Sequence, residues 1–286
     1  MSLDAKYEYL QSLLRELGAT VVAYSGGVDS SLLLKVGTDT LGERCWGLLG
    51  VSPSLAETEY RDAVALAAQI GARLKVVQTH ELDNPNYASN PTNRCYHCKT
   101  ELYDRLVEWR RAEGVEWICD GTNLDDEGDW RPGLQAAREH GVRSPLREAE
   151  LTKAELRALS QRLGLPTWDK PALACLSSRF PYGTDITPER LRMVDRAEEA
   201  VRARGVRQLR VRHHRDVTGA DLARLEIDPA EVGQLLDAAT LRSLGEELRG
   251  LGYRHVTLDL LGYRHGSANE GLAKESSAVI ALETIA

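Results

Sequence analysis

The chain has 286 residues, of which 42% are hydrophobic and 28% charged, and its formal net charge is −7. This length suits one large or two modest domains with real cores, and the composition excludes extensive disorder or a collagen-like structure. A net negative chain is poorly suited to the phosphate backbone of nucleic acids, so we expect a small-molecule partner and no nucleic acid.

The first sixteen residues, MSLDAKYEYLQSLLRE, have the spacing of an amphipathic helix and lack the apolar core of a signal peptide. No apolar stretch approaches the roughly 20 residues that cross a bilayer. We therefore expect a cytoplasmic protein without a membrane partner. The chain has five cysteines, an odd number, and in this setting free thiols, metal ligands or catalysis are favoured over disulfides.

In the first half of the chain, short apolar runs alternate with helical patterns, which is typical of βαβ units. The expected strands are residues 20–24, 45–51, 73–78, 117–121 and 142–146, and the expected helices between them are residues 29–42, 57–71 and 98–114. This order predicts the α/β class with a doubly wound parallel sheet. Ligands bind beyond the carboxyl ends of such strands, so the loops after Tyr24, Val51, Gln78 and Gly121 should share one crevice.

A further helix is expected at residues 152–164, and the Pro-flanked segment 166–187 reads as a hinge. We place the first domain at residues 1–170 and a smaller α+β C-terminal domain, for substrate binding or oligomerisation, at residues 171–286. The elements expected in the second domain are a helix at 188–204, strands at 209–214 and 222–227, a helix at 229–250 and a strand at 255–262.

The polar turn SGGVDSS, residues 25–31, joins the first expected strand to the first expected helix. Glycines allow close backbone approach to an anion, serines donate hydrogen bonds, and a helix N-terminus presents unpaired N–H groups. The missing lysine excludes a Walker loop, and the glycine spacing is not that of a dinucleotide site. The alternative is a Gly-Ser turn with a structural role only, in which Asp29 caps the helix. The candidate phosphate-binding residues are Ser25, Gly26, Gly27, Asp29, Ser30 and Ser31, and Asp29 is also a candidate Mg²⁺ ligand.

This turn resembles the PP-loop of the ATP pyrophosphatase superfamily, whose members cleave ATP between its α and β phosphates to adenylate a substrate. The resemblance implies an adenine nucleotide alpha hydrolase-like domain that uses ATP and Mg²⁺. The segment DGTNLDDEGDWRPG, residues 120–133, supports it, because Gly121, Thr122 and Asn123 resemble the superfamily's second nucleotide-contact turn. Asp125, with Asp126 and Asp129, is a candidate for orienting Mg²⁺ or ribose, and a solvated acidic loop is the alternative.

Three cysteines stand out by position. Cys95 and Cys98 form a C-x-x-C at an expected helix start, and Cys175 lies in the expected hinge, whereas Cys45 and Cys119 fall in apolar strands and are expected to pack. A lone C-x-x-C leaves open a redox pair, half a zinc site or part of an iron–sulfur site. Zinc would need two further ligands that no second motif supplies. Three thiolates suit a four-iron cluster with one iron open.

The whole chain resembles the LarE family, through SGGVDSS, NRCYHCK, GTNLDD, SRFPYGTDIT, LRVRHH and LDLLGYRHGSANEG. The resemblance implies an ATP-dependent sulfur transferase that builds the nickel-pincer nucleotide cofactor of lactate racemase. Such enzymes adenylate the carboxylates of pyridinium-3,5-biscarboxylic acid mononucleotide and convert them to thiocarboxylates. In one branch a single cysteine, matching Cys175, is sacrificed as dehydroalanine. In the other, three cysteines hold a [4Fe-4S] cluster, and with Cys95 and Cys98 this chain resembles that branch.

The resemblance also implies residues around the reacting centre and the substrate's anionic groups. Lys99 resembles the family lysine near that centre. Arg179, Arg210 and Arg212 are candidate anchors for phosphate and carboxylate, with a solvated strand face as the alternative for the last two. The acidic residues Glu198 and Glu226 are candidates for binding metal or positioning arginines, with a surface glutamate as the alternative for each. A sulfide donor and a homo-oligomer are further expectations, and segment 213–224 looks longer than the family's usual connection.

Three other functions remain open on the sequence. A tRNA 2-thiolation enzyme also joins a PP-loop to a C-x-x-C and a distant cysteine, but it predicts a basic surface that a chain at −7 does not suggest. Amidation, as in NAD or GMP synthetases, leaves the cysteines unexplained. A non-catalytic ATP-binding module that delivers sulfur or metal is the third, and release of pyrophosphate would separate it from the enzymes.

Overall fold

The computed structural model describes residues 1–126, 132–171 and 174–264. The chain divides into two compact units, Met1–Cys175 (unit 1) and Leu176–Ala286 (unit 2), and each has its own hydrophobic core. The division falls inside the segment 166–187 that the sequence marks as a hinge. Cys175 is therefore the last residue of unit 1.

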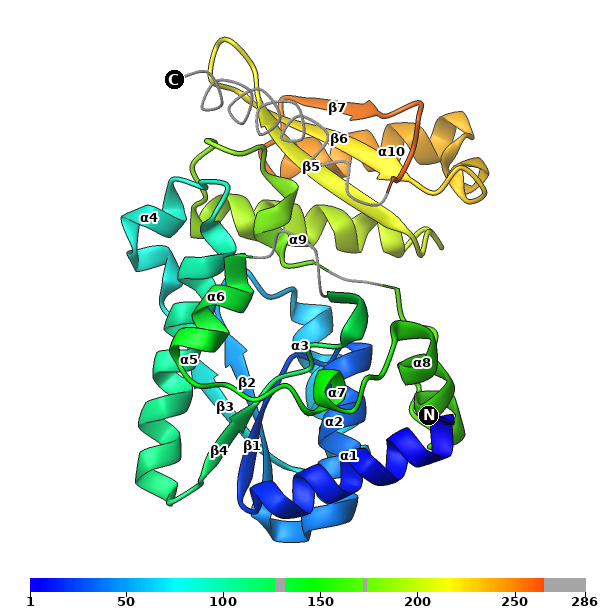
Figure 1. Cartoon of the computed structure of the whole chain (residues 1–286). Coiled ribbons are helices and arrows are strands. Elements are labelled where there is room, and N and C mark those ends of the chain that lie inside the picture. Colours follow the sequence, from blue (N-terminus) through cyan, green and yellow to red (C-terminus); the bar gives the residue numbers. More distant parts are fainter. Residues whose placement is uncertain (127–131, 172–173, 265–286) are drawn as a thin grey trace, which may run out of the picture. The chain divides into compact units, whose positions relative to one another are not determined.

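Unit 1 contains a four-stranded parallel sheet in the order β3-β2-β1-β4, which confirms the predicted α/β class (Figure 1). Its strands are β1 (Thr20–Tyr24), β2 (Cys45–Val51), β3 (Arg73–Gln78) and β4 (Trp117–Cys119). Because all four strands run in one direction, their carboxyl ends meet at one edge of the sheet. The loops that carry the candidate site start at that edge.

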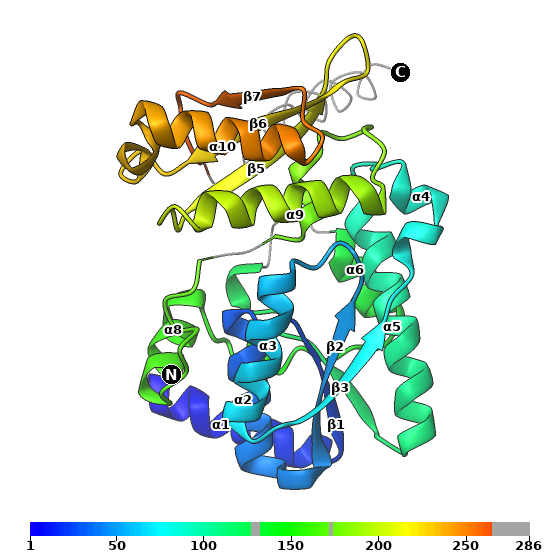
Figure 2. The ribbon, with the colours of Figure 1, turned by 180° about the vertical axis from the view of Figure 1, so that it is seen from behind.

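Helices cover both faces of this sheet, as a doubly wound fold requires (Figure 2). The helices of unit 1 are α1 (Leu3–Leu17), α2 (Val28–Leu41), α3 (Glu57–Ile70), α4 (Pro85–Ala88), α5 (Arg94–Glu113), α6 (Pro132–Glu139), α7 (Pro145–Glu148) and α8 (Lys153–Arg162). In β1, Val22 packs with α1, α2 and α3, whereas Val21 and Ala23 pack with α5 and α6. This alternation is the two-residue period of a strand buried on both sides.

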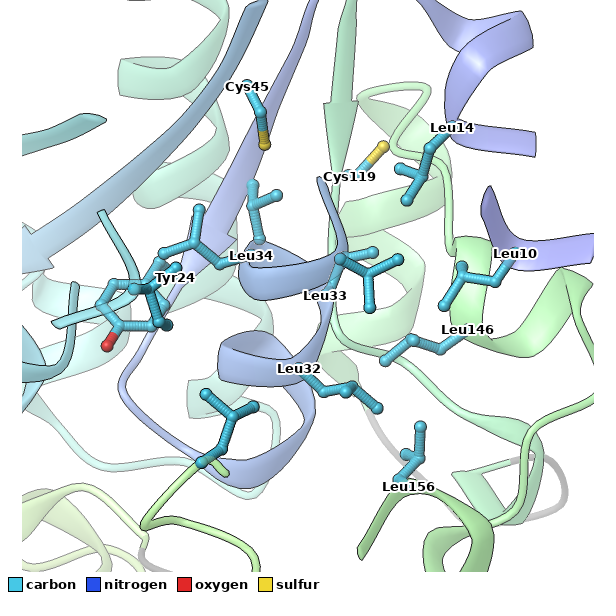
Figure 3. Close-up of a cluster of buried hydrophobic side chains, with 14 of the residues drawn as sticks. Leu10, Leu14, Tyr24, Leu32, Leu33, Leu34, Cys45, Cys119, Leu146 and Leu156 are labelled. Carbon is cyan, nitrogen blue, oxygen red and sulfur yellow. The ribbon is translucent and has the colours of Figure 1, made fainter. Parts of the chain in front are cut away.

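The larger core of unit 1 is built around α2 (Figure 3). Three consecutive leucines, Leu32, Leu33 and Leu34, are all fully buried, because α1, α8 and the sheet surround this helix. Most of this helix is buried, and its more exposed side carries the ion pair between Lys35 and Asp39. The N-terminus of α2, which follows the polar turn, is thus held in place by the best-packed helix of the unit.

Two expectations for unit 1 need correction. Residues 142–146 form no fifth strand: only Arg143 bridges to Cys119, and Pro145 then opens α7. Proline cannot donate to a ladder but suits the first position of a helix, and this ends the strand pattern. Helix α5 begins at Arg94 rather than at Cys98, so both cysteines of the C-x-x-C lie within its first turns.

Unit 2 is an α+β unit, as predicted (Figure 1). Its three-stranded sheet has the order β5-β6-β7, with β5 (Leu209–Arg215) antiparallel to β6 (Asp221–Ile227) and β6 parallel to β7 (His255–Leu258). Helices α9 (Pro188–Arg202) and α10 (Ala238–Gly250) supply residues to its core. The helix expected over 229–250 is α10 preceded by a short 3-10 turn, Val232–Leu235.

The long-looking connection at residues 213–224 is a β-hairpin. Strands β5 and β6 pair from Leu209 opposite Ile227 to Arg215 opposite Asp221. Asp216 closes the turn, because its carboxylate accepts hydrogen bonds from the N–H groups of Thr218 and Ala220 at 2.8 and 3.0 Å. Among the residues that the structure describes, no helix is both long and apolar enough to span a bilayer.

Candidate functional site

The two glycines of the polar turn at residues 25–31 have different roles. Gly26 has φ +71°, and a Cβ there would lie 2.7 Å from the Cβ of Ala63. Gly27 is the N-cap of α2 and provides no side-chain acceptor for the first N–H groups of the helix. Glycine is therefore needed at position 26, and anion binding at the N-terminus of α2 stays a prediction.

The serines of this turn differ in their exposure to solvent and in their hydrogen bonds. Ser25 is exposed, and its Oγ lies 3.1 Å from the Oγ of Ser30, which also accepts a hydrogen bond from the Ser25 N–H at 3.2 Å. This short network fixes the turn on α2. Ser30 and Ser31 are buried, so among the serines of residues 25–31 only Ser25 is exposed.

The second predicted turn packs directly on the first. A Cβ at Gly121 would lie 2.9 Å from the backbone nitrogen of Ser30, so glycine permits this approach. Asp120, at the end of β4, is buried and accepts hydrogen bonds from Thr122 and from Ser144 Oγ, the latter at 2.8 Å. The structure thus brings the two expected nucleotide-contact turns together at the carboxyl edge of the sheet.

Two acidic candidates meet at one lysine. Lys153 Nζ donates to both carboxylate oxygens of Asp29, at 2.7 and 2.5 Å, and the Lys153 N–H donates to Asp125 at 2.7 Å. Asn123 Oδ1 accepts from the Asp125 N–H at 2.9 Å, which orders the acidic turn. Asp126 is buried and caps the same turn. Asp129 lies outside the described residues.

A second lysine approaches the polar turn from the segment after α8. Lys170 Nζ lies 3.4 Å from the carbonyl oxygen of Gly26 and pairs with Glu59 at 2.7 Å. Arg157 of α8 holds that segment, because it donates to the carbonyl oxygens of Trp168 and Lys170 at 2.6 and 2.9 Å. Lys153 and Lys170 therefore both depend on α8.

A buried carboxylate lies at the ends of β2 and β3. Glu81 is 3% exposed, and its Oε1 accepts hydrogen bonds from the hydroxyls of Ser52 and Ser54. Its Oε2 has no hydrogen-bond partner within the described part of the chain. Negative charge on Glu81 also opposes ionisation of Cys98, which places this group near the cysteines.

The three singled-out cysteines all lie in unit 1. Cys95 and Cys175 are exposed and Cys98 is half-buried, and none of the three forms a disulfide. Loss of solvent raises the pKa of Cys95, and charge on Cys175 raises it further, whereas Arg94 and Lys99 act to lower it. Loss of solvent likewise raises the pKa of Cys98, to which Glu81 and Cys175 add. The three thiols are thus close enough for the charge of one to act on another.

Lys99 lies on α5, the helix that carries Cys95 and Cys98, and it opposes the rise in their pKa values. Its Nζ is 5.5 Å from the centre of the Tyr103 ring, and its Cγ would lie 3.0 Å from a Cβ at Gly133. Positive charge on Lys99 lowers the pKa of Cys95 and Cys98. A cation so placed favours the thiolate form that a metal or an electrophile requires.

The other two cysteines are core residues, as expected. Cys45 and Cys119 are both fully buried in the α2 core (Figure 3). Burial raises the pKa of Cys45 to about 12 and raises that of Cys119 well above its ordinary value. Within residues 1–126, 132–171 and 174–264, no group of three or more His, Cys, Asp or Glu side chains is arranged as a metal site.

In unit 2, two of the predicted residues form a buried ion pair. Arg179 donates from Nε and Nη2 to the two oxygens of Glu198, at 2.8 and 3.0 Å. Glu198 also pairs with Arg202 at 2.9 Å and accepts from the Val211 N–H at 3.1 Å. Burial acts to raise the pKa of Glu198, but Arg179, Arg202 and Arg210 lower it more. The carboxylate is held as an anion by arginines.

Arg210 and Arg212 lie two residues apart on β5, so they share one face of the sheet, as predicted. Arg212 pairs with the fully buried Glu226 at 2.9 Å and donates to the carbonyl oxygen of Ser178 at 2.8 Å. Burial lowers the pKa of Arg210, and Arg179 lowers it further. The alternatives of a solvated strand face and surface glutamates do not fit, because all of these side chains are buried.

Sequence reasoning missed Lys153, Lys170 and Glu81, which all lie at the carboxyl edge of the sheet. Lys153 is 124 residues from Asp29 in sequence, and single-sequence patterns do not reveal such pairings. A signal was present for one of them: Thr152 and Glu155 form a capping box, which places Lys153 at the first position of α8.

Comparison with curated proteins finds relatives that span almost the whole chain. An uncharacterised protein of Synechocystis sp. is 48% identical over 272 residues, which are 95% of this chain and all of that protein. The pyridinium-3,5-bisthiocarboxylic acid mononucleotide synthase of Lactiplantibacillus plantarum is 37% identical over 281 residues, 98% of this chain and 99% of that enzyme. The glutamine-hydrolysing GMP synthase of Aeropyrum pernix is 27% identical over 70% of this chain and 42% of its own length. No protein-family model matches the chain.

Proposed function

The chain belongs to the LarE family within the PP-loop ATP pyrophosphatase superfamily, and on this premise we propose that it is an ATP-dependent sulfur transferase acting on pyridinium-3,5-biscarboxylic acid mononucleotide. In this proposal each substrate carboxylate is adenylated with loss of pyrophosphate and then converted to a thiocarboxylate. The product serves the nickel-pincer cofactor of lactate racemase.

The observation that carries this proposal is the cysteine trio in the same unit as the PP-loop. Superfamily members share the adenylation step, so the group that attacks the activated carbon decides the product. Here two thiols lie on α5 and one lies at the end of unit 1, and charge on Cys175 raises the pKa of the other two, while Cys45 and Cys119 are buried in the core. Amidation would give these three thiols no part in the reaction.

By ligand type the three cysteines suit a [4Fe-4S] cluster, although the described side chains are not gathered as a metal site in this structure. Cys95, Cys98 and Cys175 form no disulfide, and two of them are exposed and so accessible to a cluster. Thiolates are the ligands that iron–sulfur clusters require. When bound by these three cysteines, the cluster would supply sulfide at the iron that has no protein ligand. Lys99 favours the thiolate forms that such binding needs.

The PP-loop residues account for adenylation. The substrate carboxylate oxygen attacks the α-phosphorus of ATP, the bond to the bridging oxygen of the β-phosphate breaks, and pyrophosphate leaves toward the N-terminus of α2. N–H groups there, with the exposed Ser25 hydroxyl, donate to the leaving anion. Asp29 and Asp125 are the proposed Mg²⁺ ligands, and the turn at Gly121, Thr122 and Asn123 is proposed to contact the nucleotide.

Cys175 offers a second route to the same product. Its thiolate attacks the acyl-adenylate carbon, AMP leaves, and a thioester forms. Loss of the Cα proton then breaks the Cβ–S bond, which releases the thiocarboxylate and leaves dehydroalanine. The two routes differ in turnover: the first permits many cycles with a sulfide donor, whereas the second consumes one cysteine for each sulfur.

The substrate's phosphate and second carboxylate need cationic anchors. Arg179, Arg210 and Arg212 give unit 2 a buried, arginine-rich cluster, and we propose it for this role. Glu198 and Glu226 then position the arginines, because Glu198 pairs with Arg179 and Glu226 with Arg212, and each also pairs with one further arginine, Arg202 or Arg224. A homo-oligomer and a location in the cytoplasm complete the proposal.

Anaerobic purification followed by iron, labile-sulfide and product analysis tests this function. Wild-type protein should carry a cluster and release pyrophosphate and thiocarboxylate only when both ATP and the pyridinium substrate are present. Cys175→Ala should still release pyrophosphate but form no thiocarboxylate, and Cys95→Ala should lose the cluster. The control, Cys45→Ala, changes a buried thiol outside the trio and should keep both activities. Thiocarboxylate formation by Cys175→Ala would refute the assignment, as would pyrophosphate release that needs tRNA.

A further inference from the structure

The PP-loop provides no positive charge for the triphosphate that it is proposed to hold. In SGGVDSS, residues 25–31, the only ionisable side chain is Asp29, which is acidic. A Walker loop meets this need with its own lysine. In this chain a cationic side chain for the triphosphate must therefore come from another part of the sequence.

Lys153 is the cation that the fold brings to this turn. Its Nζ lies 2.7 and 2.5 Å from the two oxygens of Asp29, which is the second residue of α2. The ammonium group is thereby held at the end of the helix where N–H groups gather. Its side chain is 36% exposed, so solvent, and equally an anion, has access to it.

The backbone around Lys153 is fixed from several sides. Thr152 caps α8 by accepting from the Glu155 N–H at 3.3 Å, and Glu155 accepts from the Thr152 N–H at 2.9 Å. Lys6 of α1 donates to both oxygens of Glu155 at 2.9 Å. The Lys153 N–H donates to Asp125. The main chain is thus anchored, while the four-carbon stem leaves the ammonium free to move between neighbouring acceptors.

Lys170 is a poorer candidate for this role. Its side chain is 16% exposed and is paired with Glu59 at 2.7 Å, and its Nζ approaches a carbonyl oxygen of the turn. These contacts indicate that it holds the shape of the loop around Gly26.

We propose that Lys153 binds the β- and γ-phosphates of ATP, and afterwards the departing pyrophosphate, and that Asp29 holds its ammonium at the PP-loop until nucleotide arrives. Phosphate oxygens then replace the Asp29 carboxylate as acceptors. Asp29 becomes available to the Mg²⁺ that accompanies ATP. The inference rests on the proposed function in one respect, which is that ATP is the ligand of the PP-loop.

Calorimetric binding of ATP, pyrophosphate and AMP to the full-length chain tests the inference. Lys153→Met should weaken ATP and pyrophosphate binding by about 10- to 100-fold, the loss expected for a charge-assisted hydrogen bond. AMP lacks both distal phosphates, so its binding should change less than threefold. Lys153→Arg should recover most of the lost affinity. Lys35→Met, which removes a lysine paired with Asp39 at 2.7 Å on the same helix, should bind all three ligands normally.

A second comparison separates phosphate binding from simple neutralisation of Asp29. If Lys153 only offsets that carboxylate, Lys153→Met should bind magnesium-free pyrophosphate normally in an Asp29→Asn background. Our inference predicts that the loss persists there. Unchanged pyrophosphate binding by Lys153→Met, or full rescue by Asp29→Asn, would overturn it while leaving the sulfur-transfer proposal intact. A wild-type protein that binds no ATP would overturn both.

Discussion

Arg179 and Glu198 form a two-pronged ion pair in which both side chains are almost completely buried, at 2% and 1% exposure. A buried pair of this kind fixes local geometry, and loss of one partner leaves the other charge without compensation. Glu198 also holds Arg202 and the Val211 N–H, so this one carboxylate joins α9, β5 and the chain around Arg179.

Glu198→Gln should therefore destabilise unit 2 severely. The substitution keeps the shape of the side chain but leaves Arg179 as an uncompensated buried cation, which typically costs about 3–5 kcal/mol. Urea unfolding followed by circular dichroism measures the change. The matched control is Glu189→Gln on the same helix, whose carboxylate pairs with Arg192 while both are mostly exposed, and it should leave the midpoint nearly unchanged. Equal effects of the two substitutions would contradict the role given to Glu198.

Gly121→Ala should weaken nucleotide binding. The added Cβ would lie 2.9 Å from Ser30 N and 3.1 Å from Asp29 Cβ, so the first turn of α2 must shift away from its present position. We expect ATP affinity to fall by about tenfold or more, as is usual when a hydrogen bond to a charged group is lost. Calorimetry checks this value. Gly245→Ala, which adds a methyl group into open space on α10, should leave ATP affinity unchanged, and a similar ATP affinity for both variants would argue against the Gly121 contact.

Alkylation should divide the five cysteines into two classes. With iodoacetamide under native conditions, we expect Cys95 and Cys175 to react first, because they are exposed, and Cys98 to follow, because it is half-buried with a raised pKa. Cys45 and Cys119 should react only after unfolding in urea, since both are fully buried. Peptide mass spectrometry gives the order. Early labelling of Cys45 or Cys119 would show that the α2 core is not closed in solution.

Unit 2 should lose stability in mild acid through His213. Burial lowers the pKa of this fully buried residue from 6.5 to about 4, against the opposing effect of Asp221 and with a further lowering by Arg190 and His214. Between these two values the unfolded chain binds the proton more readily than the folded one, so the free energy of unfolding falls as pH drops from 6.5 to 4. This pKa shift corresponds to a loss of on the order of 3 kcal/mol in the free energy of unfolding.

Urea unfolding at several pH values measures this dependence. His213→Gln should flatten the curve between pH 6.5 and 4, whatever its effect on stability at neutral pH. His255→Gln, which changes an exposed histidine of the same sheet, should keep the wild-type slope. A wild-type slope in His213→Gln would assign the acid sensitivity to other groups.

The sequence located the elements of unit 1 well where apolar runs were bounded by turn residues. The first three strands match the expected ranges residue for residue. β1 and much of β2 are buried, whereas exposed and half-buried residues alternate over the first four positions of β3. The same reasoning was wrong for residues 142–146. There the apolar pattern continues through Pro145, but the proline starts a helix after a single bridge at Arg143.

For the site, local motifs identified the two turns but not the charges around them. Gly26 and Gly121 could be recognised from the residues next to them in sequence, and each permits a close approach of neighbouring atoms. Lys153 is brought to Asp29 only when α8 packs beside α2, and no local pattern encodes that contact. Likewise, the arginines on β5 were predicted to share a face, but the pairing of Arg212 with Glu226 depends on the hairpin register.

The contact between Lys6 and Glu155 has a practical consequence for anyone who trims this protein. Helix α1 lies before the first strand and contributes no residue to the PP-loop, so a minimal nucleotide-binding fragment would seem free to start at Thr20. Yet Lys6 also donates to the carbonyl oxygen of Glu150 at 2.7 Å, and Arg162, at the far end of α8, pairs with Asp4 at 2.5 Å. A fragment without α1 would release both ends of the helix that carries Lys153, and shortening the chain would thereby alter the ligand affinity that the fragment was made to study.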